Sequence, residues 1–311
     1  GFDEVGEVTD KQVGAGHDAK ANAVKPIPLP AMLKDTPQSK SKLSDVHRFW
    51  EQTGNFYQQG SGNDNLTDPF IGLSVMPAAS SLFRDMTGIR FNHPEWIAEN
   101  CTACGKCYTI CPDTALPGLV SKLSDVLDTV VKRVKNKYGK LNYLPKAVRQ
   151  MEPEIRALFN EGDDRAKVNT MIREVAEKTV RESGNTNGMA QEFDWFFEEL
   201  GGFQFALTRP YYDLKEKQQA GSGGLFSITL NPTTCKGCME CIEVCDDDAL
   251  RPITQTEDSI ATLRQDWDLW TDLPTTPEEY NRIDDLEEKI GPLETLLLNK
   301  EAYQSFASGD G

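Results

Sequence analysis

The eight cysteines of this 311-residue chain fall into two runs with the same spacing, and no cysteine lies outside them. Each run has the form C-x2-C-x2-C-x3-C. Disulfide scaffolds are typically short, secreted and have cysteines spread along the chain, so four disulfides fit this pattern poorly. Cysteines two residues apart on a tight turn suit a shared metal site, and a reducing cytoplasm is the expected compartment. Run one holds Cys101, Cys104, Cys107 and Cys111, and run two holds Cys235, Cys238, Cys241 and Cys245.

This spacing, with a proline after the fourth cysteine of run one, is typical of bacterial ferredoxins that bind two [4Fe–4S] clusters. Three closely spaced thiolates hold one cluster, and the fourth cysteine reaches across to the other cluster. The pattern therefore predicts crossed ligand sets that use all eight cysteines as metal ligands, and no catalytic residue. Cluster one takes Cys101, Cys104, Cys107 and Cys245, and cluster two takes Cys235, Cys238, Cys241 and Cys111.

Two zinc sites are the alternative for such thiolate groups. Zinc usually takes two C-x2-C pairs that are separated by a longer stretch of chain. Here each run instead supplies four cysteines within eleven residues, with small residues such as Ala103, Gly105 and Gly237 between them. Small residues let the backbone approach inorganic sulfide and donate N–H groups to it. The pattern favours iron–sulfur clusters over zinc.

The two runs differ after the fourth cysteine, where Pro112 follows run one and Asp246, Asp247 and Asp248 follow run two. A solvated acidic turn is the simpler interpretation of the three aspartates. The crossed ligand sets suggest a second interpretation, because Cys245 belongs to cluster one. The aspartates would then lie beside cluster one, and their negative charge would lower its reduction potential.

Composition excludes several classes of function. With 33 Lys and Arg against 49 Asp and Glu, the net charge of −16 argues against a general nucleic-acid binder. No apolar run approaches the ~20 residues that span a bilayer, and no secretory signal is visible, so we expect no membrane partner. The sequence does not begin with methionine, which suggests processing or a piece of a longer protein. His17, His47 and His93 are isolated from one another and are expected to be structural or solvated.

The expected fold class is α+β: a bacterial two-[4Fe–4S] ferredoxin-like domain interrupted by a helical insertion, with extended N- and C-terminal arms. Apolar residues from Leu119 to Val134 recur at helical spacing, and three further helices are expected before residue 201. A short helix over 43–54, capped by Ser44 and stopped by Gly54, is expected in the first arm. Phe193, Trp195, Phe196 and Phe197 are expected to form bundle core plus one interface residue. The predicted segments are an arm (1–90), the first ferredoxin-like half (91–118), the insertion (119–222), the second half (223–255) and an acidic connecting segment (256–311).

The segments that flank the runs resemble the pyruvate:ferredoxin oxidoreductase family of thiamine-dependent 2-oxoacid oxidoreductases. The resemblance rests on FRDMTGIRFNHPEWIAEN, with its PEWI tetrapeptide at 94–97, and on the Trp-containing segment TEDSIATLRQDWDLWTDLP after run two. It covers residues 75–116 and 228–275, about a third of the chain. The long insertion departs from the family pattern.

The resemblance implies that this chain is an internal segment of a longer enzyme. That enzyme would decarboxylate a 2-oxoacid, such as pyruvate, on thiamine diphosphate with Mg, and would carry a third cluster elsewhere. Expected partners are the remaining domains or subunits, an external ferredoxin or flavodoxin, and further copies of the whole enzyme as a homo-oligomer. The alternative is an iron–sulfur electron-transfer subunit of another complex, such as a hydrogenase or dehydrogenase. A zinc-stabilised interaction module is a third, non-redox class.

Overall fold

A computed structural model describes residues 29–30, 33, 38–65, 68–77, 80–83, 85–161, 168–184, 186–281 and 290–305. Residues 1–28 of the expected N-terminal arm, including His17, lie outside the described residues. Helices are combined with two small sheets, in agreement with the predicted mixture of helix and strand. The predicted segment boundaries themselves stay predictions.

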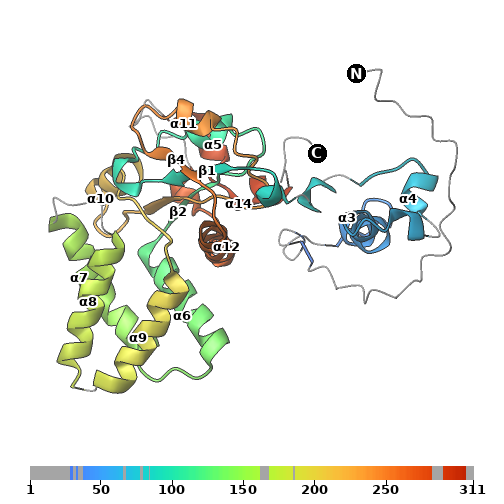
Figure 1. Cartoon of the computed structure of the whole chain (residues 1–311). Helices are drawn as coiled ribbons and strands as arrows, with labels where there is room; N and C mark the ends of the chain where they lie inside the picture. Colours follow the sequence, from blue (N-terminus) through green and yellow to red (C-terminus); the bar gives the residue numbers. More distant parts are fainter. Residues whose placement is uncertain are drawn as a thin grey trace, which may run out of the picture.

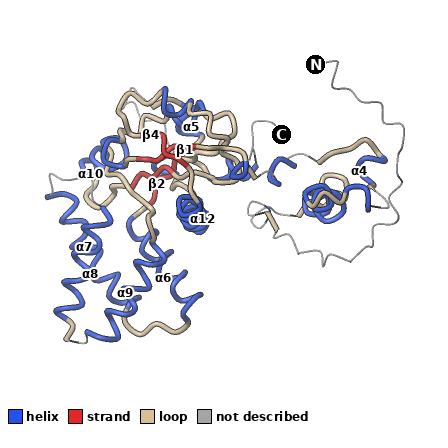
Figure 2. Tube along the Cα trace, viewed as in Figure 1, coloured by secondary structure: helices blue, strands red, loops and turns tan. Residues whose placement is uncertain are grey.

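Two short antiparallel ladders join the segment around run one to the segment around run two (Figure 2). Strand β1 (Asn92–Trp96) precedes run one and pairs with β4 (Leu250–Thr254), which follows run two. Strand β2 (Gly118–Ser121) follows run one and pairs with β3 (Leu225–Ile228), which precedes run two. Each strand that flanks run one is therefore paired with a strand that flanks run two.

The helices of the two runs lie on one side of these strands, and a longer helix lies on the other (Figure 1). Helices α5 (Lys106–Ile110) and α11 (Glu240–Glu243) come from run one and run two and contact each other. Helix α12 (Glu257–Asp272) is the Trp-containing helix that the sequence predicts. A reciprocal capping box fixes its first turn, because Thr256 and Ser259 each accept a hydrogen bond from the other's backbone N–H.

Between β2 and β3 the chain forms a four-helix bundle, in which neighbouring helices contact one another in the order α6, α7, α8, α9 and back to α6. The helices are α6 (Leu123–Tyr138), α7 (Leu144–Glu161), α8 (Val168–Glu182) and α9 (Thr186–Leu200). Their apolar residues recur at spacings of three and four and are buried together, as amphipathic helices require. Phe193 and Phe196 belong to this core, as predicted, and Trp195 and Phe197 are partly buried and pack against it.

Three details of the helix predictions are wrong. Leu119 lies in β2 and not in the first bundle helix, because pairing with β3 holds residues 118–121 extended until the helix begins at Leu123. The N-terminal helix begins with Asp45 as its cap, whose side chain accepts a hydrogen bond from the His47 N–H. That helix continues past Gly54, because Val46–Phe49 (α2), a π-helical turn Trp50–Gly54 and Asn55–Gln58 (α3) follow without a break.

The remaining elements are short. Among the described residues, no helix is long and apolar enough to cross a membrane. The short α-helices are α4 (Pro69–Gly72), α10 (Leu214–Gln218), α13 (Pro292–Leu296) and α14 (Lys300–Ser305). The 3-10 turns are Gly62–Asp64, Ser80–Phe83, Met86–Gly88, Ala98–Asn100 and Glu278–Tyr280, and a second π-helical turn is Arg209–Asp213.

A buried carboxylate from α9 supplies the hydrogen bonds that the start of α7 lacks. Glu192 is 4 % exposed and accepts backbone N–H groups of Asn142, Tyr143 and Leu144 at 2.8–3.0 Å. The first turn of a helix leaves such donors unpaired and carries partial positive charge, so a carboxylate there is stabilising. This contact ties α7 to α9.

Replacing Glu192 with alanine is expected to destabilise the bundle by about 2–4 kcal/mol, because three backbone N–H groups, of which that of Leu144 is buried, lose a charged acceptor. Urea unfolding followed by far-UV circular dichroism measures the loss. Glu198→Ala is the control, because Glu198 lies on the same helix and pairs with Lys137 at the surface. Equal losses in the two variants would contradict the assigned role of Glu192.

Candidate metal centre

The structure gathers the eight cysteines into two groups, each around its own cavity. Three members of each group come from one run and the fourth comes from the other run. We name these the upstream cavity and the downstream cavity after the run that supplies three cysteines. Cys101, Cys104, Cys107 and Cys245 line the upstream cavity. Cys235, Cys238, Cys241 and Cys111 line the downstream cavity. These are the groups that the crossed pattern predicts, and the binding of clusters by them stays a prediction.

Backbone hydrogen bonds next to the ladders explain this exchange. Four residues before Cys101, the Ile97 N–H donates to the Ala249 carbonyl at 2.8 Å, four residues after Cys245. The equivalent bond in the other half joins the Asn231 N–H to the Ala115 carbonyl at 2.7 Å. Each bond ties the segment that enters one run to the segment that leaves the other. The fourth cysteine of each run is therefore held beside the first cysteine of its partner.

The two runs also share an unusual backbone conformation. Positive φ angles occur at three equivalent pairs of positions: Ala103 and Gly237, Gly105 and Met239, and Thr114 and Asp248. At Gly237 (φ +72°) a Cβ atom would lie 2.6 Å from the Asn92 carbonyl oxygen, so only glycine fits there. A non-glycine residue in this region, such as Ala103 or Met239, costs of order 1–3 kcal/mol. The same backbone conformation at matching positions indicates an equivalent loop geometry in both runs.

The fourth cysteine of each run accepts a backbone hydrogen bond at its sulfur. The Ala115 N–H donates to Cys111 Sγ at 3.2 Å, and the Ala249 N–H donates to Cys245 Sγ at 3.3 Å. A donor directed at sulfur tunes the potential of a bound cluster. The sequence gives no direct signal for these bonds, because any residue other than proline supplies an N–H.

All eight cysteines are free thiols, and burial makes most of them weak acids. Burial raises the pKa of Cys101 and of Cys235 to about 11 and that of Cys241 to about 12. It also raises the pKa of Cys107 and Cys111. At neutral pH these thiols would therefore stay protonated unless a cationic metal group displaced their protons. Loading of the sites is accordingly expected to release protons.

The cysteine groups fit a [4Fe–4S] cluster better than one zinc ion. Four thiolates around a cavity are the donor set that such a cluster takes. A zinc ion instead needs its sulfur ligands at about 2.3 Å from one point. Within the described ranges, no group of three or more His, Cys, Asp or Glu side chains is arranged to hold a single metal ion.

The aspartates after run two lie beside the loop of run one, as expected if they act on cluster one. The Thr102 hydroxyl donates to Asp247 Oδ2 at 2.5 Å, and Asp247 also lines the upstream cavity. Lys106 from run one forms an ion pair with Asp246. The placement predicted for the aspartates is confirmed. The expected effect of these charges on a bound cluster is smaller than the sequence alone suggests, because Lys106 offsets the carboxylate of Asp246.

A buried arginine stands beside the downstream cavity. Arg90 is 6 % exposed, and its guanidinium donates to the carbonyl oxygens of Pro232 and Cys235 at 2.7 Å each. It also donates to Gln255 at 2.5 Å. Its positive charge favours the Cys235 thiolate, against the larger opposing effect of burial. Arg90 was not identified from the sequence as part of the site. Its position just before β1 is the only feature of the sequence that could have indicated this role.

The two histidines in the described part of the chain lie outside both cysteine groups. His93 is buried in β1, with its ring nitrogens near the Pro94 carbonyl (3.1 Å) and the Ser259 hydroxyl (3.0 Å). Burial lowers the pKa of His93, so the ring is neutral at pH 7. This agrees with the expected structural role for His93. His47 lies in α2 and is half-buried.

Comparison with known proteins supports an iron–sulfur site. Residues 93–116 match a family described as "4Fe-4S binding domain". The matched region contains residues 93–96 of β1 and all of run one, and it supports at least one [4Fe–4S] cluster. No curated protein matches the chain.

The cavity linings predict which cysteine variants share a phenotype. Cys245→Ser is expected to remove the same cluster as Cys101→Ser, because both residues line the upstream cavity. Cys111→Ser is expected to match Cys235→Ser instead. The EPR spectra of the reduced variants, together with their iron contents, show which cluster each variant has lost. A spectrum of Cys245→Ser that matched that of Cys235→Ser would contradict the crossed arrangement.

Proposed function

We propose that this chain binds two [4Fe–4S] clusters, one in each cysteine-lined cavity, and conducts electrons between them. The observation that carries the proposal is the pair of equivalent loops, each of which completes its cysteine group with a residue of the other. Such a cluster accepts and releases one electron at a time. The family match to run one supports the same chemistry. Because run two repeats the backbone conformation of run one, we infer a second cluster site there.

The residues around the cavities would hold and tune these groups. The cysteines supply the ligands, and the N–H groups of Ala115 and Ala249 donate to sulfur. Apolar side chains, including Trp96, Phe226 and Leu250 at the upstream cavity, reduce access of water. Low local polarity and hydrogen bonds to sulfur are the means by which a protein sets a cluster potential.

We further propose that the chain is the two-cluster segment of a 2-oxoacid:ferredoxin oxidoreductase. The resemblance around the PEWI tetrapeptide and in α12 supports this assignment. Electrons from oxidation of a 2-oxoacid, such as pyruvate, at a thiamine diphosphate site with Mg would pass through this segment to ferredoxin or flavodoxin. The thiamine site and a third cluster would belong to other parts of the enzyme. An electron-transfer subunit of a hydrogenase or dehydrogenase is the second candidate, and the same cysteine groups would serve it.

Anaerobic purification of the chain tests the electron-transfer function. The protein is expected to be brown, to bleach with dithionite, and to regain its colour when oxidised ferredoxin or flavodoxin is added. A colourless protein that contains zinc would overturn the proposal. Purification of the native complex tests the assignment to a 2-oxoacid:ferredoxin oxidoreductase. That assignment requires a thiamine-binding polypeptide or domain in the same complex. It fails if the complex contains a hydrogenase or dehydrogenase subunit instead.

Charges at the upstream cavity are expected to shift one cluster potential and not the other. Asp247→Asn removes a negative charge and is expected to raise the potential of cluster one, on the order of tens of millivolts. Lys106→Gln removes a positive charge and is expected to lower it. Glu99→Gln, an exposed carboxylate before run one, is the control. Potentiometric EPR titration measures each potential, and unchanged values in both variants would contradict the role of these charges.

A further inference from the structure

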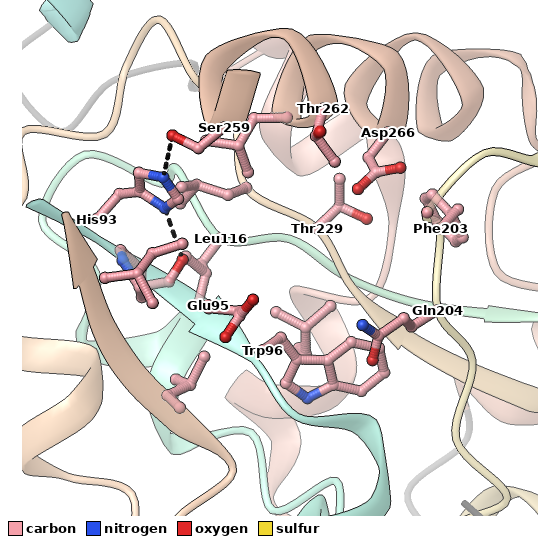
Figure 3. A pocket seen from close by; sticks show the side chains of 17 residues that line it. His93, Glu95, Trp96, Leu116, Phe203, Gln204, Thr229, Ser259, Thr262 and Asp266 are labelled. Atoms are coloured by element: carbon pink, nitrogen blue, oxygen red, sulfur yellow. Dashed lines mark hydrogen bonds between the residues drawn. The ribbon is translucent and has the colours of Figure 1, made fainter. Parts of the chain in front are cut away.

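A third cavity, of about 320 Å³, lies between the strands and α12 and contains none of the cysteines (Figure 3). Its volume is at the lower end of the range for small-molecule sites. We name it the α12 cavity. Trp96, Ile228 and Leu250 line both this cavity and the upstream cavity, so the two are separated by a shared wall. Its other apolar wall residues include Leu116, Phe203 and Leu263.

Two buried side-chain oxygen atoms of the α12 cavity lack hydrogen-bond partners among the described residues. Thr229 is 4 % exposed, and its Oγ1 has no partner. Asp266 reaches into the cavity from α12, and its buried Oδ1 has no partner either (Figure 3). Buried polar atoms are almost always hydrogen-bonded, and an unpaired one costs free energy. Both atoms are therefore available to a ligand.

The carboxyl group of Asp266 also lacks a counter-charge in the cavity wall. Burial alone raises the pKa of Asp266 to about 7. The other titratable residues that line the cavity are His93 and Glu95, both on β1. His93 is neutral at pH 7 because burial lowers its pKa, and its ring nitrogens face the Pro94 carbonyl and the Ser259 hydroxyl. Glu95 pairs with Arg251 at 2.5 Å.

We propose that the α12 cavity binds a small organic cation, a compact apolar ring that carries one protonated amine or amidine group. The cationic group pairs with the Asp266 carboxylate and donates a hydrogen bond to Thr229 Oγ1. The ring packs against the apolar wall, where Trp96 and Phe203 offer aromatic surface to a cation and to a ring alike. This binding function is separate from the proposed electron transfer and does not require that the cysteines hold clusters.

Benzylamine is the probe, and isothermal titration calorimetry with the full chain at pH 8 is the measurement. Benzyl alcohol has the same ring without the charge and is expected to bind at least tenfold more weakly. Asp266→Asn is expected to weaken benzylamine binding at least tenfold, and Thr229→Val by a smaller factor. Asp258→Asn, an exposed carboxylate on the same helix, is expected to leave the affinity unchanged.

The pH dependence gives an independent readout. A cation binds the ionised carboxylate, so bound ligand lowers the pKa of Asp266, and the affinity falls as the pH falls through 7. Below that pH the decrease approaches about tenfold per unit. The Asp266→Asn variant is expected to show a flat profile between pH 5.5 and pH 8.

The proposal is overturned if benzylamine binds no more tightly than benzyl alcohol, or if wild type and Asp266→Asn share one pH profile. Thermal unfolding checks that the variant is folded. If Asp266→Asn does not fold, Thr229→Val decides the question, since weaker binding with the wild-type pH profile is the expected result. Unchanged affinity in Thr229→Val would then count against the site.

Discussion

The candidate metal centre depends on the pairing of strands that lie far apart in the sequence. Pairing of β1 with β4 and of β2 with β3 joins the segments around the two runs. It places Cys245 beside the upstream loop and Cys111 beside the downstream loop. Neither run completes its cysteine group alone. Ligand binding and folding would therefore be coupled, because a cluster would link both halves of the chain.

The same pairing explains why a long helical insertion is compatible with the site. The bundle leaves the sheet after Ser121 and returns at Leu225, and these two residues are partners in the β2–β3 ladder. An insertion whose ends are neighbours can grow outward without disturbing the strands. The apolar residues of the bundle share one core with residues outside it, such as Trp267 and Trp270 of α12. The bundle also has buried contacts between its own helices, such as Glu192 at the start of α7.

Cysteine spacing alone predicts both cysteine groups, because the three-residue and four-residue offsets within a run restrict how a loop can surround a cluster. Helical periodicity likewise predicts the bundle. The start of the first bundle helix was predicted incorrectly, since strand pairing overrides the helical pattern at Leu119. Arg90 and the α12 cavity could not be predicted. Both depend on side chains from distant segments, such as Thr229 and Asp266, that meet only in the folded chain.

The most direct test of the crossed two-cluster site is the iron and acid-labile sulfide content of the anaerobically purified chain, measured with the EPR spectrum of its reduced form. Two [4Fe–4S] clusters predict about eight iron and eight sulfide per chain, with a spectrum that shows magnetic interaction between neighbouring clusters. About four iron per chain in wild type, unchanged in Cys235→Ser, would contradict the account, because the downstream cysteines would then hold no cluster.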